Sequence, residues 1–537
     1  GVGASGNGTK SYFVLRGAGM DSTVLDCRST STCLTIGGGG VDYNWNYPTT
    51  NNVVSSAVKG STSITIGDAS PFLVGHIMML DAAADHTLPI VNTGGYDIYT
   101  TTGPNQGNRW QAVMVTGVSG NTISFWPPLY DTYTANGTLV VVHEATKNAA
   151  FVGLEDFKID ANNTAQQTLS MDEQYGSWIT NVHTYHATNH SISISDSLNC
   201  QLDHDFFDEV IHTGTNGFGL GTEHMSGCLV EDNIFYDNWP NFEINFGTAG
   251  NVFAYNFSKG QVAFDIDTNH GPHNNFNLFE GNIAAYLESD GYFGSEAYET
   301  MFRNWFQGNG WYCVNLKRFS RNFSLIGNIL GTPGNNAAYD CVAFGQPNIG
   351  NQGYSGFAPP WPDQYQDQIR TSNGTLTING TDLSSSVPFF VPEDADPTLT
   401  ASHRIGLYST GQVFDIVGYI SPTEVTAASW ESVSTPITTS GFWDAPGVGG
   451  WQELDQDVQA TTILKDNYYY LGASIPASEF IGAQALPASL YLGGKPSWFG
   501  SLTWPPFDPA NPGPSDDSIP AGWRFDHPGQ DTPGVTG

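Results

Sequence analysis

The sequence predicts an all-β protein whose main body is a right-handed parallel β-helix, a solenoid built from short strands. Residues 198–330 repeat one unit: an apolar residue, two others, an Asn, and then an apolar or aromatic residue. The Asn residues of the five clearest units stand 23, 26, 22 and 24 residues apart, at Asn233, Asn256, Asn282, Asn304 and Asn328. A fixed period of this size, together with 62 Gly and only 13% charged residues, is typical of a turn-rich solenoid.

Each unit has the length of one coil of three short strands joined by turns. We expect each Asn to lie at a bend, where it tolerates a left-handed backbone and its amide can bond the Asn of the next coil. Fainter units at residues 154–157 and 178–182 extend the series upstream, and residues 464–468 read as a late coil. The alternative is a β-sandwich with Asn-rich turns, but its strands would not share one phase across five units.

Breaks in this period divide the chain. Residues 58–66 and 118–125 alternate apolar and polar residues around Gly-Asn turn chemistry, which predicts a small inserted β subdomain. The segment after residue 344 holds long, aromatic, loop-like sequence. The predicted organisation is therefore first coils in 1–54, a β subdomain in 55–145, the main β-helix in 146–344, a loop-rich insertion in 345–460, and a last coil with the tail in 461–537.

The opening sequence resembles a known group of proteins. Residues 11–26 hold a strand, then Arg-Gly-Ala-Gly and Thr-Val-Leu, a phrase similar to the opening coils of the pectate-lyase-like β-helix superfamily. Residues 486–500 resemble the C-terminal ends of secreted bacterial β-helix proteins. The resemblance implies the fold, whereas the superfamily includes lyases, hydrolases, epimerases and phage tailspikes. Its polygalacturonase motifs and its pectate-lyase calcium signature are absent from this sequence, so no catalytic residue is carried over.

The N-terminal end raises a question of capping. In that superfamily a helix normally covers the first coil, but only about ten residues precede the phrase here. A bare coil exposes unpaired backbone groups and an open apolar cross-section. We expect upstream residues, a loop of the 55–145 insertion, or a neighbouring subunit to cover it. The last would be head-to-tail self-association, which can continue as a filament.

Charge limits the partners. The net charge of −35 argues against nucleic acid and anionic membranes, and it favours a neutral or weakly charged glycan over a polyanion. No run of about 18 apolar residues is present, so membrane insertion is not expected. The chain begins at Gly1 without a signal peptide, which we read as a processed mature chain.

The six cysteines predict the compartment. Two pairs are 28 residues apart, at equivalent positions of neighbouring coils, where stacked side chains come within disulfide reach. Three disulfides would indicate a secreted protein, extracellular or at the cell surface. Free buried thiols are the alternative for the two stacked pairs. The predicted disulfides are Cys27–Cys33, Cys200–Cys228 and Cys313–Cys341.

A polar patch interrupts the outward face of one strand in successive coils. Side chains alternate along a strand, so apolar residues of 242–246, 264–267 and 314–317 point inward and their neighbours point outward. The outward residues predicted are Glu243, Asn245, Asp265, Asp267, Asn315 and Lys317. The residues predicted to bind substrate are Asn245, Asn315 and Lys317 of this patch, with His270, His273, Asp290 and Arg318 beside it. Glu223, His224 and Arg321 also flank the patch.

The patch contains the groups needed to cleave a glycosidic bond. Asp265 and Asp267 should place their carboxyls about 6.5–7 Å apart, near the spacing of an inverting hydrolase. Glu243 on the adjacent coil is a like-charged neighbour, which would raise one pKa and supply the general acid. The leading hypothesis is therefore an extracellular glycoside hydrolase acting on a polysaccharide, with Asp265, Asp267 and Glu243 as catalytic residues.

Two alternatives remain open. The same three carboxylates, Glu243, Asp265 and Asp267, could hold Ca²⁺ in a polysaccharide lyase, with Lys317 or Arg318 as the base. A non-catalytic adhesin, tailspike-like module or filament-forming protein is the second alternative, because carboxylates on a solenoid face are often simply solvated.

Overall fold

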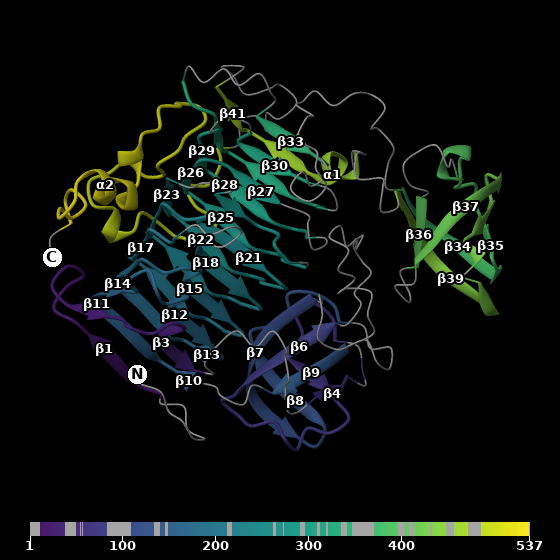
Figure 1. The fold of residues 1–537 in the computed structure, drawn as a ribbon, viewed down its shortest axis with the longest axis horizontal. Helices are drawn as coiled ribbons and strands as arrows, with labels where there is room; N and C mark the ends of the chain where they lie inside the picture. Colours follow the sequence, from purple (N-terminus) through teal and green to yellow (C-terminus); the bar gives the residue numbers. More distant parts are fainter. Residues whose placement is uncertain are drawn as a thin grey trace.

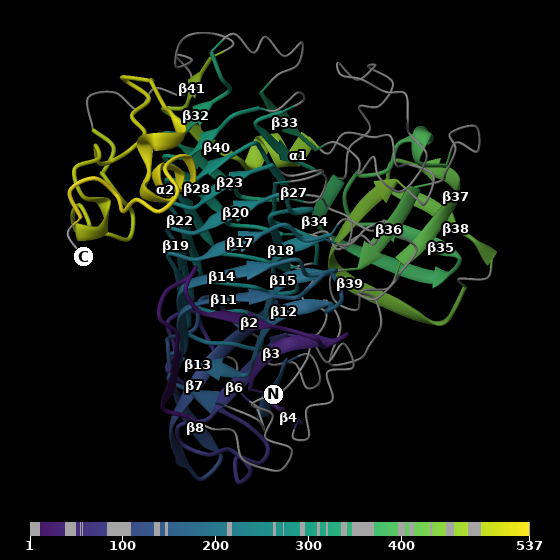
Figure 2. The same ribbon diagram turned by 60° about the vertical axis from the view of Figure 1, so that its left-hand side comes forward.

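The computed structural model describes most of the chain. The described residues are 11–37, 50–53, 55, 57–82, 109–133, 140–144, 149–211, 217–260, 265–271, 273–289, 296–308, 312–317, 320–333, 341–345, 370–395, 403–407, 413–429, 432–446, 456–470 and 485–535. Figures 1 and 2 show the β-helix as a stack of short parallel strands, with the subdomain at one end of the stack and the tail along one side. The predicted parallel β-helix is confirmed.

The face that matters most for function is a nine-stranded parallel sheet, called here the front sheet. Its strands alternate an inward apolar residue with an outward polar one, as a half-exposed strand requires. In stacking order they are β3 (Thr32–Gly37), β12 (Gln167–Asp172), β15 (His190–Ser195), β18 (Phe218–Glu223), β21 (Phe242–Asn245), β24 (Ile266–Asp267), β27 (Leu287–Ser289), β30 (Val314–Leu316) and β33 (Val342–Phe344).

Two parallel ladders complete each coil, and long strands β11 and β14 contribute to both. The first ladder holds β1 (Phe13–Arg16), β11 (Val152–Asp160), β14 (Trp178–Tyr185), β16 (Gln201–Asp203), β19 (Leu229–Glu231), β22 (Val252–Ala254), β25 (Leu278–Glu280), β28 (Thr300–Phe302), β31 (Ser324–Ile326) and β40 (Ile463–Lys465). The second holds β2 (Val24–Asp26), β17 (Phe206–Asp208), β20 (Ile234–Tyr236), β23 (Phe257–Lys259), β26 (Ile283–Ala284), β29 (Trp305–Phe306), β32 (Ile329–Leu330) and β41 (Tyr468–Tyr469). A short pair, β10 (Ala149–Ala150) and β13 (Gln174–Tyr175), begins a further row of parallel bridges.

Identical side chains stack where coils repeat. Phe253 and Phe279 share one register position, and their rings stack with centroids 5.0 Å apart. The predicted Asn ladder is present, with the Asn256 amide donating to Asn282 at 3.0 Å and the Asn282 amide donating to Asn304 at 2.9 Å. The expected left-handed backbone lies one residue earlier, for example at Arg303, because the Asn itself must turn its amide inward.

The inserted subdomain is a six-stranded antiparallel sheet with its own apolar core. Trp110 and Ala112 of β7 face the β-helix, where the Ala112 amide donates to Ser226 Oγ at 3.0 Å. The subdomain is thereby attached to the coils that flank the front sheet. Its strands are β4 (Thr50–Asn52), β9 (Val140–Glu144), β6 (Ile77–Ala82), β7 (Arg109–Ser119), β8 (Thr122–Trp126) and β5 (Ser63–Thr65).

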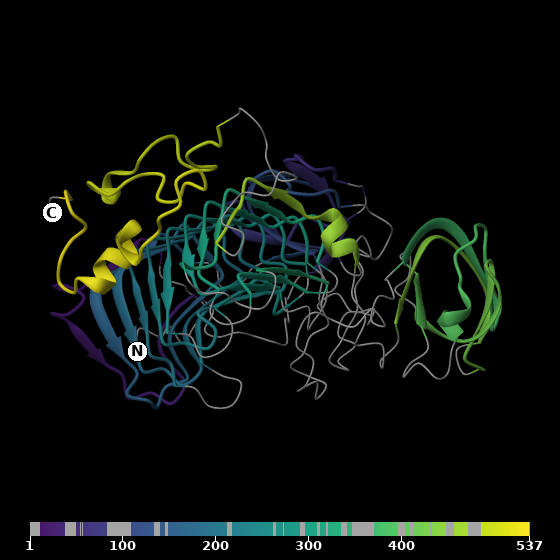
Figure 3. The ribbon, with the colours of Figure 1, turned by 90° about the horizontal axis from the view of Figure 1, so that it is seen from above.

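The prediction of a loop-rich insertion is wrong for residues 370–446, which form a closed antiparallel barrel (Figure 3). Alternation of buried apolar residues such as Leu376, Ile378 and Leu383 indicates strands here, although the aromatic segments suggested loops. The barrel strands are β34 (Arg370–Gly380), β35 (Asp382–Ser385), β38 (Glu424–Ala427), β37 (Val413–Ser421), β36 (His403–Leu407) and β39 (Val433–Pro446).

The C-terminal tail packs along the two ladders opposite the front sheet. Phe499 and Phe507 are buried against Tyr255 and Phe257, and the Arg524 guanidinium donates to Asp232 at 2.7 Å. The described residues include two short helices, α1 (Gln456–Thr461) and α2 (Pro520–Asp526), and the 3-10 turns η2 (Pro392–Ala395), η4 (Ser497–Phe499) and η5 (Asp516–Ser518). No helix among the described residues is long and apolar enough to cross a membrane.

The first coil differs from the coils above it. Among the described residues, β1 and β2 pair only with β11, so the other edge of each strand has no strand partner. The inward residues Phe13 and Leu15 are only partly buried, whereas Val152 and Leu154, their register partners, are fully buried. Within the described residues, the first coil therefore ends the stack of strands.

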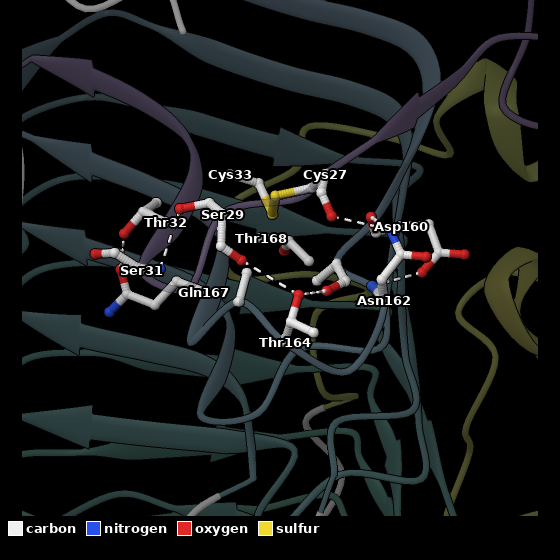
Figure 4. The surroundings of a disulfide bond; sticks show 12 residues. Cys27, Ser29, Ser31, Thr32, Cys33, Asp160, Asn162, Thr164, Gln167 and Thr168 are labelled. Atoms are coloured by element: carbon white, nitrogen blue, oxygen red, sulfur yellow. Dashed lines mark hydrogen bonds between the residues drawn. A yellow bond between two sulfur atoms is a disulfide. The ribbon is translucent and has the colours of Figure 1, made fainter.

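Two of the three predicted disulfides are present, Cys27–Cys33 and Cys313–Cys341. Figure 4 shows Cys27–Cys33 closing its loop above the turn that holds Asn162, whose amide donates to the Cys27 carbonyl at 2.9 Å. The prediction of a Cys200–Cys228 disulfide is wrong, since both are free thiols. They occupy the register of a second Asn ladder, so Cys228 Sγ accepts from the Cys200 amide at 3.2 Å, as an Asn oxygen would.

Candidate functional site

The front sheet brings outward carboxylates into one vertical column. Glu243 of β21 pairs in register with Asp267 of β24, and Asp267 pairs with Glu288 of β27. Adjacent strands are about 4.8 Å apart, so these side chains are direct neighbours on one face. We call the Glu243, Asp267 and Glu288 side chains the acidic column. Below it the same register position is occupied by Gly221.

Asp265 does not join the column, and its predicted outward orientation is wrong. Strand β24 begins at Ile266, so the alternation that was extended to Asp265 does not apply to it. Its carboxylate accepts hydrogen bonds from Asn241, from Ser258 and from the Ala285 amide, and the residue is 0% exposed. Burial raises the pKa of Asp265 to about 6, while these hydrogen bonds oppose the rise. Asp265 is an interior residue of the turn between β23 and β24.

Glu243 lies between two imidazoles. His190 Nε2 is 3.1 Å from Glu243 Oε2, and His270 Nε2 is 3.5 Å from Glu243 Oε1. His190 starts β15, two strands below β21, and its ring crosses the intervening strand over Gly221. A Cβ on Gly221 would lie 2.7 Å from that ring, so only glycine permits this contact.

His270 joins the lower two members of the column. Its Nδ1 lies 3.5 Å from Asp267 Oδ2, while its Nε2 faces Glu243. The His270 side chain is 33% exposed, whereas Glu243 and Asp267 are almost fully buried. The Phe218 ring stacks on His190 at 4.7 Å and lies 6.4 Å from the His270 ring. An aromatic surface therefore borders these carboxylates.

The upper member of the column is neutralised by a cation. Lys317 Nζ forms an ion pair with Glu288 Oε1, and both side chains are buried. The Asn315 amide donates to Glu288 Oε2 at 3.1 Å. Lys317 and Asn315, both predicted to bind substrate, thus both contact Glu288, which is not among the residues predicted from the sequence. The alternation in residues 285–289 carries the missing signal, since Leu287 points inward and Glu288 outward.

A second acidic group lies beside the column. Glu223 ends β18, diagonal to Glu243, and is only 7% exposed. Burial raises its pKa well above the ordinary value, and the nearby carboxylates of Asp196, Glu243 and Asp172 raise it further. Glu223 Oε1 is buried without a hydrogen-bond partner among the described residues. Glu223 therefore favours its neutral, protonated form in a position where Glu243 is held between imidazoles.

The remaining predicted residues are dispersed. Asn245 is half-buried and pairs in register with Glu223, so it borders the site. His273 is buried in the turn after β24 and has a left-handed backbone. His224 hydrogen-bonds Asp196 at 2.8 Å and stacks on Trp110 of the subdomain. Asp290 and Arg318 lie outside the described residues.

The calcium hypothesis does not fit the residues present. Asp265 turns inward, and the His270 ring lies between Glu243 and Asp267, so the three carboxylates do not converge on one point. Within the described part of the chain, no group of three or more His, Cys, Asp or Glu could hold a metal ion.

No protein-family model and no curated protein matches the sequence. Among solved structures, the chain is similar to the tailspike protein gp49 from Pseudomonas phage LKA1, with 11% identity and a TM-score of 0.41 over 81% of this chain and 87% of that one. It is also similar to the Gp54 tailspike of Acinetobacter baumannii bacteriophage AP22, solved in complex with A. baumannii capsular saccharide, with 13% identity, a TM-score of 0.40 and coverage of 74% and 83%. A mannuronic acid specific polysaccharide family 6 lyase from human gut microbiota matches at 15% identity and a TM-score of 0.25, over 40% of this chain and 62% of that one. Likenesses this distant carry no argument about this chain, and its parallel β-helix fold rests on its own strand pairing.

Proposed function

We propose that this protein is a polysaccharide-cleaving glycoside hydrolase whose site is the front-sheet face around Glu243 and Asp267. The observation that carries the proposal is the acidic column beside Glu223: carboxylates in direct register, one of them held by two imidazoles. Hydrolysis of a glycosidic bond needs one protonated and one ionised carboxyl on the same side of the protein. Glu223 and Glu243, on adjacent strands of this face, are the two carboxyl groups that we assign to these roles.

The two roles follow from the surroundings of each group. Glu223, whose pKa is raised by burial and by three neighbouring carboxylates, is the general acid that protonates the leaving oxygen. Glu243 is the base that activates water, and His190 and His270 orient its two oxygens. Glu223 and Glu243 lie on adjacent strands, two residues out of register, so their Cα atoms are about 8 Å apart by strand geometry.

Hydrolysis is favoured over a lyase mechanism. A lyase needs a free base that removes a proton beside a sugar carboxylate. Lys317 and Arg318 were the candidates, and Arg318 lies outside the described residues. Lys317 Nζ is buried in an ion pair with Glu288, so it is not free to take that proton. The acidic surroundings would also repel a uronate chain.

We also propose that the protein works outside the cell. Disulfides persist in oxidising compartments, and two are present here. An extracellular setting matches a polymeric substrate that cannot enter a cell.

The test is an assay of a glycan panel for two products. New reducing ends without absorbance from unsaturated sugars are expected, and Glu243→Gln and Glu223→Gln should each lower the rate at least about 100-fold. Asp382→Asn is the matched control, because this exposed carboxylate lies on the barrel. Full activity in Glu243→Gln would reject the site, and unsaturated products would reject the hydrolase in favour of a lyase. Binding of a glycan without any cleavage would leave a non-catalytic, adhesin-like protein.

A further inference from the structure

We propose that the acidic column and the carboxylates beside it bind a polysaccharide whose sugars carry free amino groups. This inference names the substrate class of the site proposed above and rests on it. A glucosamine-type polymer carries one ammonium group on each sugar, and each ammonium can pair with one carboxylate.

The charge of the face supports a cationic chain. Asp196, Glu243 and Asp172 lie close enough to Glu223 for their negative charges to act on it. The nearby cation Lys317 is already paired with Glu288. A face of this charge attracts cations and repels sulfated or uronic-acid glycans.

One buried atom points to a missing partner. Glu223 is 93% buried and its Oε1 has no hydrogen bond within the described structure, although it faces three other carboxylates. Burying a carboxyl oxygen without a donor is costly. An ammonium group of the ligand would supply up to three N–H donors to this cluster. Glu223 Oε1 is thus an acceptor that lacks a donor, and this favours a ligand rich in N–H donors.

The geometry of the solenoid suits a polymer. Column members recur once per strand, about every 4.8 Å, which is comparable to the length of one pyranose unit. A chain lying along the stack would present one sugar to each coil, with its ammonium near Glu243 or Asp267 in turn. Phe218, which stacks on His190 beside the column, offers an apolar surface for the face of a sugar ring.

Binding to the full-length protein can be measured by calorimetry with three oligomers: glucosamine, N-acetylglucosamine and galacturonic acid. The first two share one backbone and differ only in charge, so they isolate the ammonium group. We expect the glucosamine oligomer to bind at least about tenfold more tightly than its acetylated form at low salt, with the gap narrowing as salt rises. Galacturonate oligomers should bind more weakly still.

Asp267→Asn should reduce the preference for the glucosamine oligomer, and the barrel variant Asp382→Asn should preserve it. Equal or tighter binding of the acetylated or the anionic oligomer overturns the inference, and so does no binding of any oligomer. Cleavage is measured separately on the same three oligomers. Preferential binding without cleavage supports this inference while contradicting the proposed hydrolase. Cleavage of the acetylated or anionic oligomer alone supports the hydrolase and contradicts this inference.

Discussion

His190 and Glu243 are hydrogen-bonded at 3.1 Å although a whole strand of the front sheet separates them. The contact passes over Gly221, the one place where the intervening strand β18 offers no side chain in that column. His190 is further fixed by stacking on Phe218. The orientation of Glu243, the candidate base, therefore depends on Gly221, which takes no direct part in the proposed reaction.

Gly221→Ala tests this dependence. A Cβ at 2.7 Å from the His190 ring must displace the ring, so we expect a loss of activity of about tenfold or more with a destabilisation of about 1–3 kcal/mol. Initial rates and thermal unfolding measure the two effects. Gly117→Ala is the control, because a Cβ there meets nothing closer than 3.7 Å. Unchanged rates in Gly221→Ala would show that the His190 contact does not matter for turnover.

Asp205→Asn should stabilise the protein. Asp205 takes the position of Asn233 one coil lower, where its Oδ1 accepts from the Val182 amide at 2.8 Å. Its other oxygen is buried without a partner, and burial raises the pKa of this carboxyl well above the ordinary value. An amide nitrogen would instead donate to a carbonyl of the coil below, as every higher ladder Asn does. We expect a gain of about 1 kcal/mol in urea unfolding, and a loss of stability would contradict the ladder argument.

Stability should fall as pH rises from about 4.5 to 7. Burial raises the pKa of Glu231 to about 7 in the folded chain, against the ordinary value of 4.5. Between these values the folded chain keeps a proton that the unfolded chain releases, so the free energy of unfolding decreases with pH, by about 3 kcal/mol at most. Glu231→Gln keeps an acceptor for Tyr491 and should flatten the curve. Urea unfolding at pH 5 and pH 8 of both proteins checks this, and identical slopes would refute it.

Thiol counting tests the cysteine assignment. The chain holds six Cys, of which four form the two disulfides, so we expect two free thiols for each chain. Both are buried, and burial raises the pKa of Cys228, so they should react with a thiol reagent only after unfolding. If the denatured protein has no free thiol, Cys200 and Cys228 form the third disulfide and this assignment is wrong.

The outer edge of the first coil, which has no strand partner among the described residues, favours association between chains. Val24 of β2 is 54% exposed on a strand whose outer edge has no described partner. We expect the mass measured by sedimentation equilibrium to rise with concentration, and Val24→Lys to suppress the rise, because lysine on an edge strand blocks pairing. Val118→Lys, on the subdomain, is the control. A monomer at every concentration would eliminate contact through this end.

The repeating parts of the molecule could be predicted from the sequence, and the singular parts could not. Asn256, Asn282 and Asn304 reveal the coil in the sequence because each makes the same hydrogen bonds at the same position of its coil. Glu243 and Asp267 were identified because strand alternation holds across β21 and β24. That alternation fails one residue before β24, which is why Asp265 was misassigned.

The contacts that could not be predicted depend on single residues that do not recur from coil to coil. The His190–Glu243 contact needs a glycine in the strand between them, and no pattern within one strand reveals it. Cys228 replaces an Asn of the second ladder, so its spacing from Cys200 suggested a disulfide although the sulfur acts as a hydrogen-bond acceptor. The barrel was missed because its aromatic segments outweighed its strand alternation.

The Asn ladder makes one coil interchangeable with the next. Each ladder Asn presents the same donor upward and the same acceptor downward, so removal or duplication of a whole coil would leave the joint chemically unchanged. A gene encoding such a protein can change length in units of one coil without redesigning its core. Since the acidic column is spread over consecutive coils, each such event would also move its carboxylates apart or together by one strand spacing. The distance between the reactive groups can therefore change only in steps of one strand spacing, whether through evolution or through engineering.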